Sequence, residues 1–209
     1  MKIENLNKSF GITHANVNIN FELKAGEVRG LAGENGSGKS TLLSQIAGLY
    51  GSDSGKMYIR GEEYSPKNPV DANNHKVAMV VQELGMIGSL PASINIYLGK
   101  TKKFIKMNDL QDQANAVSDR WGLPRVNLKR MAGSMNIENR KMVELIRALA
   151  ADPDILILDE VTQSLSHDNR KVLYNLIEKF KGEGRSSSDL PRSGRGNPAD
   201  RLHLHLTRR

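Results

Sequence analysis

One segment constrains the fold of this chain more than any other feature, and it reads Gly33-Glu34-Asn35-Gly36-Ser37-Gly38-Lys39-Ser40-Thr41. It matches the pattern G-x-x-x-x-G-K-[ST], whose glycines let the backbone curl so that successive N–H groups point at phosphate oxygens. Residues 28–32 predict a short strand before this loop, and residues 39–49 predict an amphipathic helix after it. A strand, a phosphate loop and a helix in this order predict an α/β fold that binds ATP.

Within the loop, two side chains have distinct expected roles. The ammonium group of Lys39 is expected to reach the β- and γ-phosphates, and the hydroxyl of Ser40 is expected to bind Mg²⁺. The N-terminus of the following helix adds its positive end to the same site. ATP and Mg²⁺ are therefore the expected ligands of residues 33–41.

A second motif is the apolar run of residues 155–158, which ends in Asp159 and Glu160. A continuous apolar run is typical of a strand buried on both faces of a parallel sheet. Asp159 is expected to hold Mg²⁺, directly or through water. Glu160 is expected to polarise the attacking water as general base.

The rest of the chain predicts a mixed fold. Alternating apolar residues at 17, 19, 21 and 23 indicate a half-buried strand, and residues 56–60 and 76–81 indicate two more. The section 84–150 has apolar residues at helical spacing, and a further helix is expected over 168–181. Residues 187–209 are rich in Ser, Pro, Gly and Arg, and no regular structure is predicted for them.

Composition narrows the class of protein. The chain has no cysteine, which excludes disulfides and Cys-based zinc sites. No stretch is long and apolar enough to span a membrane, and the N-terminus has no apolar signal-peptide core. A cytoplasmic protein is expected.

The net charge of +7 would suit a nucleic-acid partner, but dispersed basic residues favour an ordinary solvated surface, so no nucleic acid is expected.

These motifs and others resemble the ATP-binding subunits of ABC transporters, specifically the monosaccharide (ribose- and xylose-type) importers, over about residues 1–186. Asp53-Ser54-Gly55 is similar to the turn "PDSG" of that family. Residues 93–99 are similar to "AENIFLG", and residues 142–149 to "MVEIARAL". The resemblance implies a P-loop NTPase core with a RecA-like parallel sheet, an antiparallel β subdomain and an inserted α-helical subdomain at about 84–150.

The same resemblance implies two further site residues. Val81-Gln82-Glu83-Leu84 is similar to "HQEL", so Gln82 is identified as the Q-loop glutamine, which contacts Mg²⁺ and the attacking water. Phe10 lies where the family stacks an aromatic ring on adenine; the alternative is an ordinary core residue.

The partners implied are membrane-spanning permease subunits and a second ABC ATPase domain, as a homodimer or heterodimer. A periplasmic or extracellular sugar-binding protein would act indirectly. The expected location is peripheral, on the cytoplasmic face of the membrane.

The chain departs from the family at its signature loop, which reads roughly "LSxGQ" and closes over the γ-phosphate of the opposite subunit. Here the matching residues are Met135-Asn136-Ile137-Glu138-Asn139. A carboxylate at Glu138 would repel a triphosphate. The hypothesis is that this chain binds ATP but supports the opposite site poorly. Residues 161–166 also depart from "PTSALT", because the proline is lost.

After residue 186 the family continues with a buried strand, a switch histidine and a terminal "LRDG", none of which this chain carries. His167, His203 and His205 lie in the wrong context to replace the switch histidine. Codons for residues 186–192, read one nucleotide later, can spell Leu-Leu-Leu-Ile-Ser-His-Asp. The hypothesis is a frameshifted tail, and loss of a core strand could cost several kcal/mol.

Two alternatives to an importer ATPase remain open. A degenerate subunit or gene remnant that binds ATP without turnover is favoured by Asn136, Glu138 and the tail. A soluble ABC-type ATPase acting on nucleic acid is favoured only by the net charge, and salt-dependent DNA binding would support it.

Overall fold

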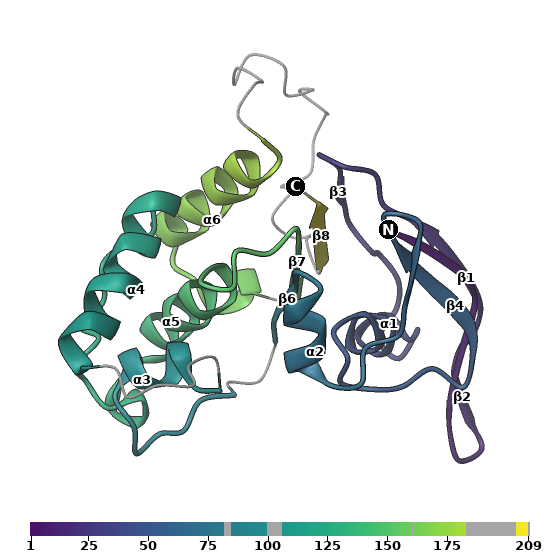
Figure 1. The fold of residues 1–209 in the computed structure, drawn as a ribbon, viewed down its shortest axis with the longest axis horizontal. Coiled ribbons are helices and arrows are strands. Elements are labelled where there is room, and N and C mark those ends of the chain that lie inside the picture. The colour runs from purple at the N-terminus through teal and green to yellow at the C-terminus, as the bar shows by residue number, and fades with distance from the viewer. Residues whose placement is uncertain (82–84, 100–105, 160, 183–203, 209) are drawn as a thin grey trace.

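The computed structural model describes residues 1–81, 85–99, 106–159 and 161–182, together with the backbone of residues 204–208. These residues form two lobes, one mostly helical and one mostly of strands (Figure 1). Strands β6 (Val77–Val80) and β7 (Ile155–Asp159) lie between the lobes. The predicted α/β class, with an antiparallel β part and a helical part, is confirmed.

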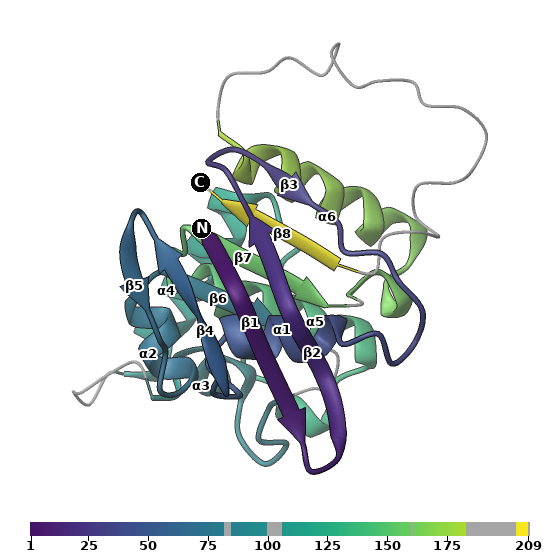
Figure 2. The same ribbon diagram turned by 90° about the vertical axis from the view of Figure 1, so that its right-hand side faces the viewer.

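The first sheet is antiparallel, as expected. Its order is β2-β1-β4-β5, with β1 at Lys2–Phe10, β2 at Thr13–Glu22, β4 at Ser54–Ile59 and β5 at Glu62–Tyr64. Figure 2 shows β1 and β2 crossing in front of helix α1 (Lys39–Ile46). The predicted alternation in β2 holds only in part, because Val17 is 57% exposed whereas Leu23, just after the strand, is buried.

The second sheet has the order β3-β8-β7-β6. Strands β6 and β7 are parallel, which confirms the expected parallel core at this point. Strand β3 is only Val28–Arg29, shorter than the expected strand over 28–32, and it pairs with β8. The chain then leaves the sheet to form the phosphate loop.

Strand β8 (Leu204–Arg208) differs from the sequence expectation, which predicted no regular structure in the tail. It runs antiparallel between β3 and β7 and pairs with all of Ile155–Asp159. The sequence around it alternates His and Leu with a period of two, which suits a strand. An open edge of β7 would otherwise leave its backbone groups unpaired. Residues 187–203 and 209 lie outside the described residues.

The helices match most predicted segments. Besides α1 they are α2 (Pro69–Asn74), α3 (Ala92–Tyr97), α4 (Met107–Trp121), α5 (Ile137–Leu149) and α6 (His167–Phe180), with short 3₁₀ turns at Ala132–Ser134 and Val161–Ser164. Helix α1 ends before residue 49, because Gly48 takes a left-handed conformation (φ 73°) and Leu49 is 46% exposed. No helix among the described residues is long and apolar enough to cross a membrane.

Strand β7 joins two hydrophobic clusters, and its side chains alternate between them. Leu156 and Leu158 pack in the cluster formed with α3 to α6, whereas Ile155 and Ile157 pack in the cluster formed with β1, β4 and α1. All five residues of β7 are buried. The prediction of a strand covered on both faces is confirmed.

We expect Leu156→Ala to lower the free energy of unfolding by about 2–5 kcal/mol, because Leu156 is fully buried and truncation leaves a cavity. Leu98→Ala is the matched control, since Leu98 is 42% exposed. Urea denaturation of both variants measures the difference. Equal losses would contradict the placement of β7 between two cores.

Candidate nucleotide-binding site

The phosphate loop wraps around the side chain of Lys39, the first residue of α1. The ammonium Nζ donates to the carbonyl oxygens of Gly33 at 2.8 Å and Glu34 at 2.7 Å, and to Ser37 Oγ at 3.3 Å. Gly36 and Gly38 have φ angles of 83° and 84°, a conformation that favours glycine. The loop therefore holds a cation at the N-terminus of a helix, where an anionic phosphate is favoured.

Strand β2 packs directly against this loop at Gly38. A Cβ atom on Gly38 would lie 2.1 Å from the carbonyl oxygen of Ala15 and 2.4 Å from Asn16 Oδ1. Gly38 is also the N-cap of α1. The backbone of β2 thus fixes the point where the loop becomes a helix.

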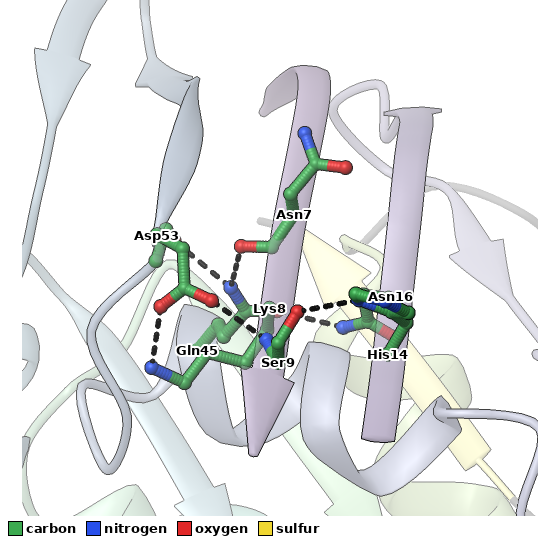
Figure 3. Close-up of polar contacts among 8 residues, drawn as sticks. Asn7, Lys8, Ser9, His14, Asn16, Gln45 and Asp53 are labelled. Carbon is green, nitrogen blue, oxygen red and sulfur yellow. Dashed lines mark hydrogen bonds and ion pairs between the residues drawn. The ribbon is translucent and has the colours of Figure 1, made fainter. Parts of the chain in front are cut away.

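A buried polar pair beneath the loop was not predicted from the sequence. The side-chain amides of Asn16 on β2 and Gln45 on α1 form a hydrogen bond of 2.7 Å, and both residues are buried (Figure 3). Gln45 Nε2 also donates to Ser52 Oγ at 3.0 Å. The available signal was a glutamine on the apolar face of α1, between Leu42 and Ile46. This pair locks α1 to the antiparallel sheet.

The end of β1 is held by Asp53, which lies in the turn that resembles "PDSG". Its carboxylate accepts from Lys8 Nζ at 2.9 Å and from the backbone N–H of Ser9 at 2.7 Å (Figure 3). The hydrogen bond from Lys8, and then that from Ser9, lower the pKa of Asp53.

Phe10 follows Ser9 and is the last residue of β1. It is 44% exposed, so it is not a core residue. Its ring meets that of Tyr50 edge to face, with 5.2 Å between centroids. The exposed face suits stacking on a base, and that role stays a prediction.

Asp159 lies at the carboxyl end of β7 and is 4% exposed. Strands β3 and β7 are both antiparallel to β8, so they run in the same direction. Their carboxyl ends therefore meet the same edge of the sheet, and the phosphate loop follows β3 at that edge. Ligands of open α/β sheets bind at this edge.

Two expected site residues, Gln82 and Glu160, lie outside the described residues. Among the described residues no three His, Asp or Glu side chains gather as a metal site. A Mg²⁺ bound with ATP needs only one or two carboxylates, because phosphate oxygens and water supply the other ligands. Asp159 and Ser40 have oxygen donors of the required type, so their chemistry fits the ion.

The two residues that differ from the family's signature loop, Asn136 and Glu138, form hydrogen bonds within this chain. Asn136 is the N-cap of α5, and its side chain accepts from the N–H of Asn139 at 2.8 Å. Glu138 Oε1 accepts from the N–H of Ser166 at 2.8 Å and from Asn169 Nδ2 at 2.7 Å. Hydrogen bonds from the Ser166 hydroxyl, then from the Asn169 amide and then from the Ser166 N–H lower the pKa of Glu138. The carboxylate thus joins the starts of α5 and α6.

The comparisons with known proteins agree with this geometry. The family model described as "ABC transporter" matches residues 17–163. The ribose import ATP-binding proteins of Caldanaerobacter subterraneus and Rhodococcus jostii are 30% and 31% identical, over 89% and 88% of the chain. The chain spans only 38% and 37% of the length of these two relatives.

Solved structures show the same fold. A dimeric bacterial ABC transporter cassette has a TM-score of 0.75 and is 24% identical, covering 86% of this chain and 82% of its own. A second structure, of an ATP-binding cassette bound to ADP and Pi after hydrolysis, also has a TM-score of 0.75 and 24% identity, over 87% and 83% of the two chains. With a family model matching most of its length, the chain belongs to the ABC transporter family.

Proposed function

We propose that this chain binds MgATP in residues 33–41 and hydrolyses it together with a second cassette, as the ATP-binding part of a sugar importer. The observation that carries the proposal is the arrangement around Lys39. Its ammonium lies within the phosphate loop, at the N-terminus of α1, and Asp159 ends a strand at the same sheet edge. The relatives named for ribose import support a monosaccharide as the cargo.

In the proposed reaction, Lys39 and the N–H groups of the loop bind the β- and γ-phosphate oxygens. Asp159 and Ser40 would hold Mg²⁺, which would neutralise charge on those oxygens. Gln82 orients the attacking water, and Glu160 accepts its proton as the oxygen attacks the γ-phosphorus. The bond to the β-phosphate oxygen then breaks, and ADP and phosphate leave.

The proposed partners follow from the family. The second cassette would complete each ATP site, in line with the dimeric cassette structures. Permease subunits would anchor the chain at the cytoplasmic face of the membrane, with a sugar-binding protein acting outside. Phe10, with Tyr50 beside it, would stack on adenine.

ATP turnover by the purified chain, beside ATP binding by the same preparation, tests the proposal. We expect binding by the wild type and by Glu160→Gln, and turnover only by the wild type, since removing a general base costs about 10²–10⁴-fold in rate. Turnover unchanged in Glu160→Gln would reject the assigned base. Failure of the wild type to bind ATP would reject the nucleotide site.

A second candidate function, an ATP-binding subunit without turnover, is favoured by one observation. The Glu138 carboxylate is held against the start of α6, in the segment where the family places a signature glycine. A nucleotide bound in a site that this segment completes would lie close to Asn136 and to the negative charge of Glu138. In a pair of identical chains this segment would complete both sites, so the chain would bind ATP without turnover.

The double variant Asn136→Ser/Glu138→Gly separates the two candidates. If the signature segment limits turnover, restoring the family residues should raise ATPase activity by about tenfold or more, because a repulsion of a few kcal/mol is removed. Glu178→Gln, on the exposed side of α6, is the charge control. An unchanged rate in the double variant would show that Asn136 and Glu138 do not limit turnover.

A further inference from the structure

A network of hydrogen bonds runs beneath the phosphate loop, from the start of α1 to the end of β1. Its centre is the amide pair Asn16 and Gln45, which are 3% and 0% exposed and bonded at 2.7 Å (Figure 3). A buried amide costs free energy unless it is hydrogen-bonded, and two apolar residues of the same shape would pack there without that cost. A fully bonded polar pair does, however, hold its neighbours in one arrangement. The pair therefore makes better sense as a device that fixes position than as one that adds stability.

One end of the network meets the phosphate loop. A Cβ atom on Gly38 would lie 2.4 Å from Asn16 Oδ1, so the amide lies directly against the N-cap of α1. With its nitrogen turned toward the loop, the Asn16 amide donates to the carbonyl oxygens of Gly38 at 3.0 Å and Ala15 at 2.8 Å. Its oxygen then accepts from the N–H of Leu42 at 3.2 Å, and the 2.7 Å bond to Gln45 is kept. Asn16 thus holds the last glycine of the loop and the first turn of α1.

The other end of the network reaches the strand that carries Phe10. Gln45 Nε2 lies 3.0 Å from Ser52 Oγ, and a hydroxyl can donate or accept, so this bond forms in either orientation of the amides. The next residue, Asp53, accepts from the N–H of Ser9 at 2.7 Å (Figure 3). Ser9 directly precedes Phe10 at the end of β1. The backbone before Phe10 is therefore tied to α1 through Asp53, Ser52 and Gln45.

The ring of Phe10 is held by two further contacts. Lys8 Nζ, which forms an ion pair of 2.9 Å with Asp53, lies 5.5 Å from the centroid of the Phe10 ring. The ring of Tyr50 meets it edge to face. Asp53 therefore fixes both the residue before Phe10 and the cation over its ring. Through this network the position of Phe10 depends on the position of Gly38.

We propose that Asn16 and Gln45 are positioning residues, which set the spacing between the phosphate loop and Phe10 so that one nucleotide can bind both. The inference rests on the proposed function, in which residues 33–41 bind the phosphates and Phe10 stacks on adenine. Asn16 acts through Gly38, and Gln45 acts through the segment Ser52–Asp53. The spacing that they set favours a nucleoside triphosphate over a phosphate chain that lacks a base.

The double variant Asn16→Leu/Gln45→Leu tests the proposal with two ligands, MgATP and magnesium tripolyphosphate, which has the phosphates of ATP without base or sugar. We expect the preference for ATP, the ratio of the two affinities, to fall by about 5- to 100-fold, since stacking one base on an aromatic ring contributes that much. Calorimetric titration measures both affinities. The urea midpoint should stay close to that of the wild type, because both partners of the hydrogen bond become apolar. An unchanged preference would overturn the proposal.

Phe10→Ala completes a cycle with this double variant. It should lower the same preference, and the triple variant should lower it no further, because the amide pair acts through Phe10. A fall in Phe10→Ala without a fall in the double variant overturns the spacing role and leaves the proposed function standing. An unchanged preference in Phe10→Ala rejects the adenine role of Phe10, and the spacing role with it.

Asn20→Leu is the matched control. Asn20 lies on the same strand as Asn16, but it is exposed and accepts from the N–H of Asn5 at 3.0 Å. Its preference for ATP should equal that of the wild type, and a fall as large as in the double variant would overturn the proposal. Should the double variant not fold, Ser52→Ala takes its place, since it removes an exposed hydroxyl and leaves the buried pair bonded. An unchanged preference in Ser52→Ala would then overturn the spacing role.

Discussion

Replacing Lys39 by Ala is expected to weaken ATP binding by about 100-fold or more. Each hydrogen bond from an ammonium to a phosphate is worth roughly 1.5–3 kcal/mol, and Lys39 can make two. The loop already holds this ammonium within 2.8 Å of two carbonyl oxygens, so little further ordering is needed when phosphate arrives. Isothermal titration calorimetry with MgATP measures the loss.

Lys171→Ala is the control for charge, because Lys171 is exposed on α6 and forms a surface ion pair with Asp168. Its affinity for ATP should equal that of the wild type. The Lys39 variant also loses its contacts to Gly33 and Glu34, so thermal unfolding must show that it stays folded. A folded Lys39→Ala chain with wild-type affinity would remove residues 33–41 from the proposed ATP site.

The features that could be predicted from the sequence are local ones. The phosphate loop is a short pattern in which each residue type has its own task. The apolar run of residues 155–158 predicted strand β7, because a strand buried on both faces has no alternation of polar residues. Helices α5 and α6 were predictable because their apolar residues repeat along a single helix. In all these cases the information lies within about 15 consecutive residues.

The features that escaped prediction depend on contacts between distant segments. Asn16 and Gln45 are polar residues whose burial makes sense only once β2 lies across α1. Glu138 was expected to repel a phosphate, and its contact with Ser166 depends on how α5 and α6 meet. Strand β8 pairs with the edge of β7 that lies opposite β6. Its pairing is antiparallel, a direction that no local pattern encodes.

Strand β8 also bears on the frameshift hypothesis, which remains a prediction. The expected loss of a core strand would have left one edge of β7 open, whereas the structure pairs this edge with residues 204–208. Alternating residues of nearly any origin can serve as an antiparallel strand, because backbone groups make the pairing. Resequencing the coding DNA tests the hypothesis directly, and an uninterrupted frame shared by homologous genes would reject it.

Gly38→Ala should destabilise the chain far more than Gly36→Ala, although both glycines lie in the phosphate loop with almost the same φ angle. The left-handed conformation costs any other residue about 1–2 kcal/mol, and Gly36→Ala should lose no more, because nothing lies within 4 Å of the added methyl group. At Gly38 the methyl group would meet the backbone oxygen of Ala15 at 2.1 Å. Forcing such an overlap adds about 1–3 kcal/mol or more.

The two variants therefore separate the conformational cost of the loop from the cost of its contact with β2. Urea denaturation should place Gly38→Ala about 1–3 kcal/mol below Gly36→Ala. ATP binding should fall more in Gly38→Ala as well, because β2 must move away from the start of α1 and from the buried pair Asn16–Gln45. Equal stabilities of the two variants would mean that β2 can move away from the added methyl group at no cost in free energy. The close packing of β2 on the loop would then not fix the position of the phosphate site.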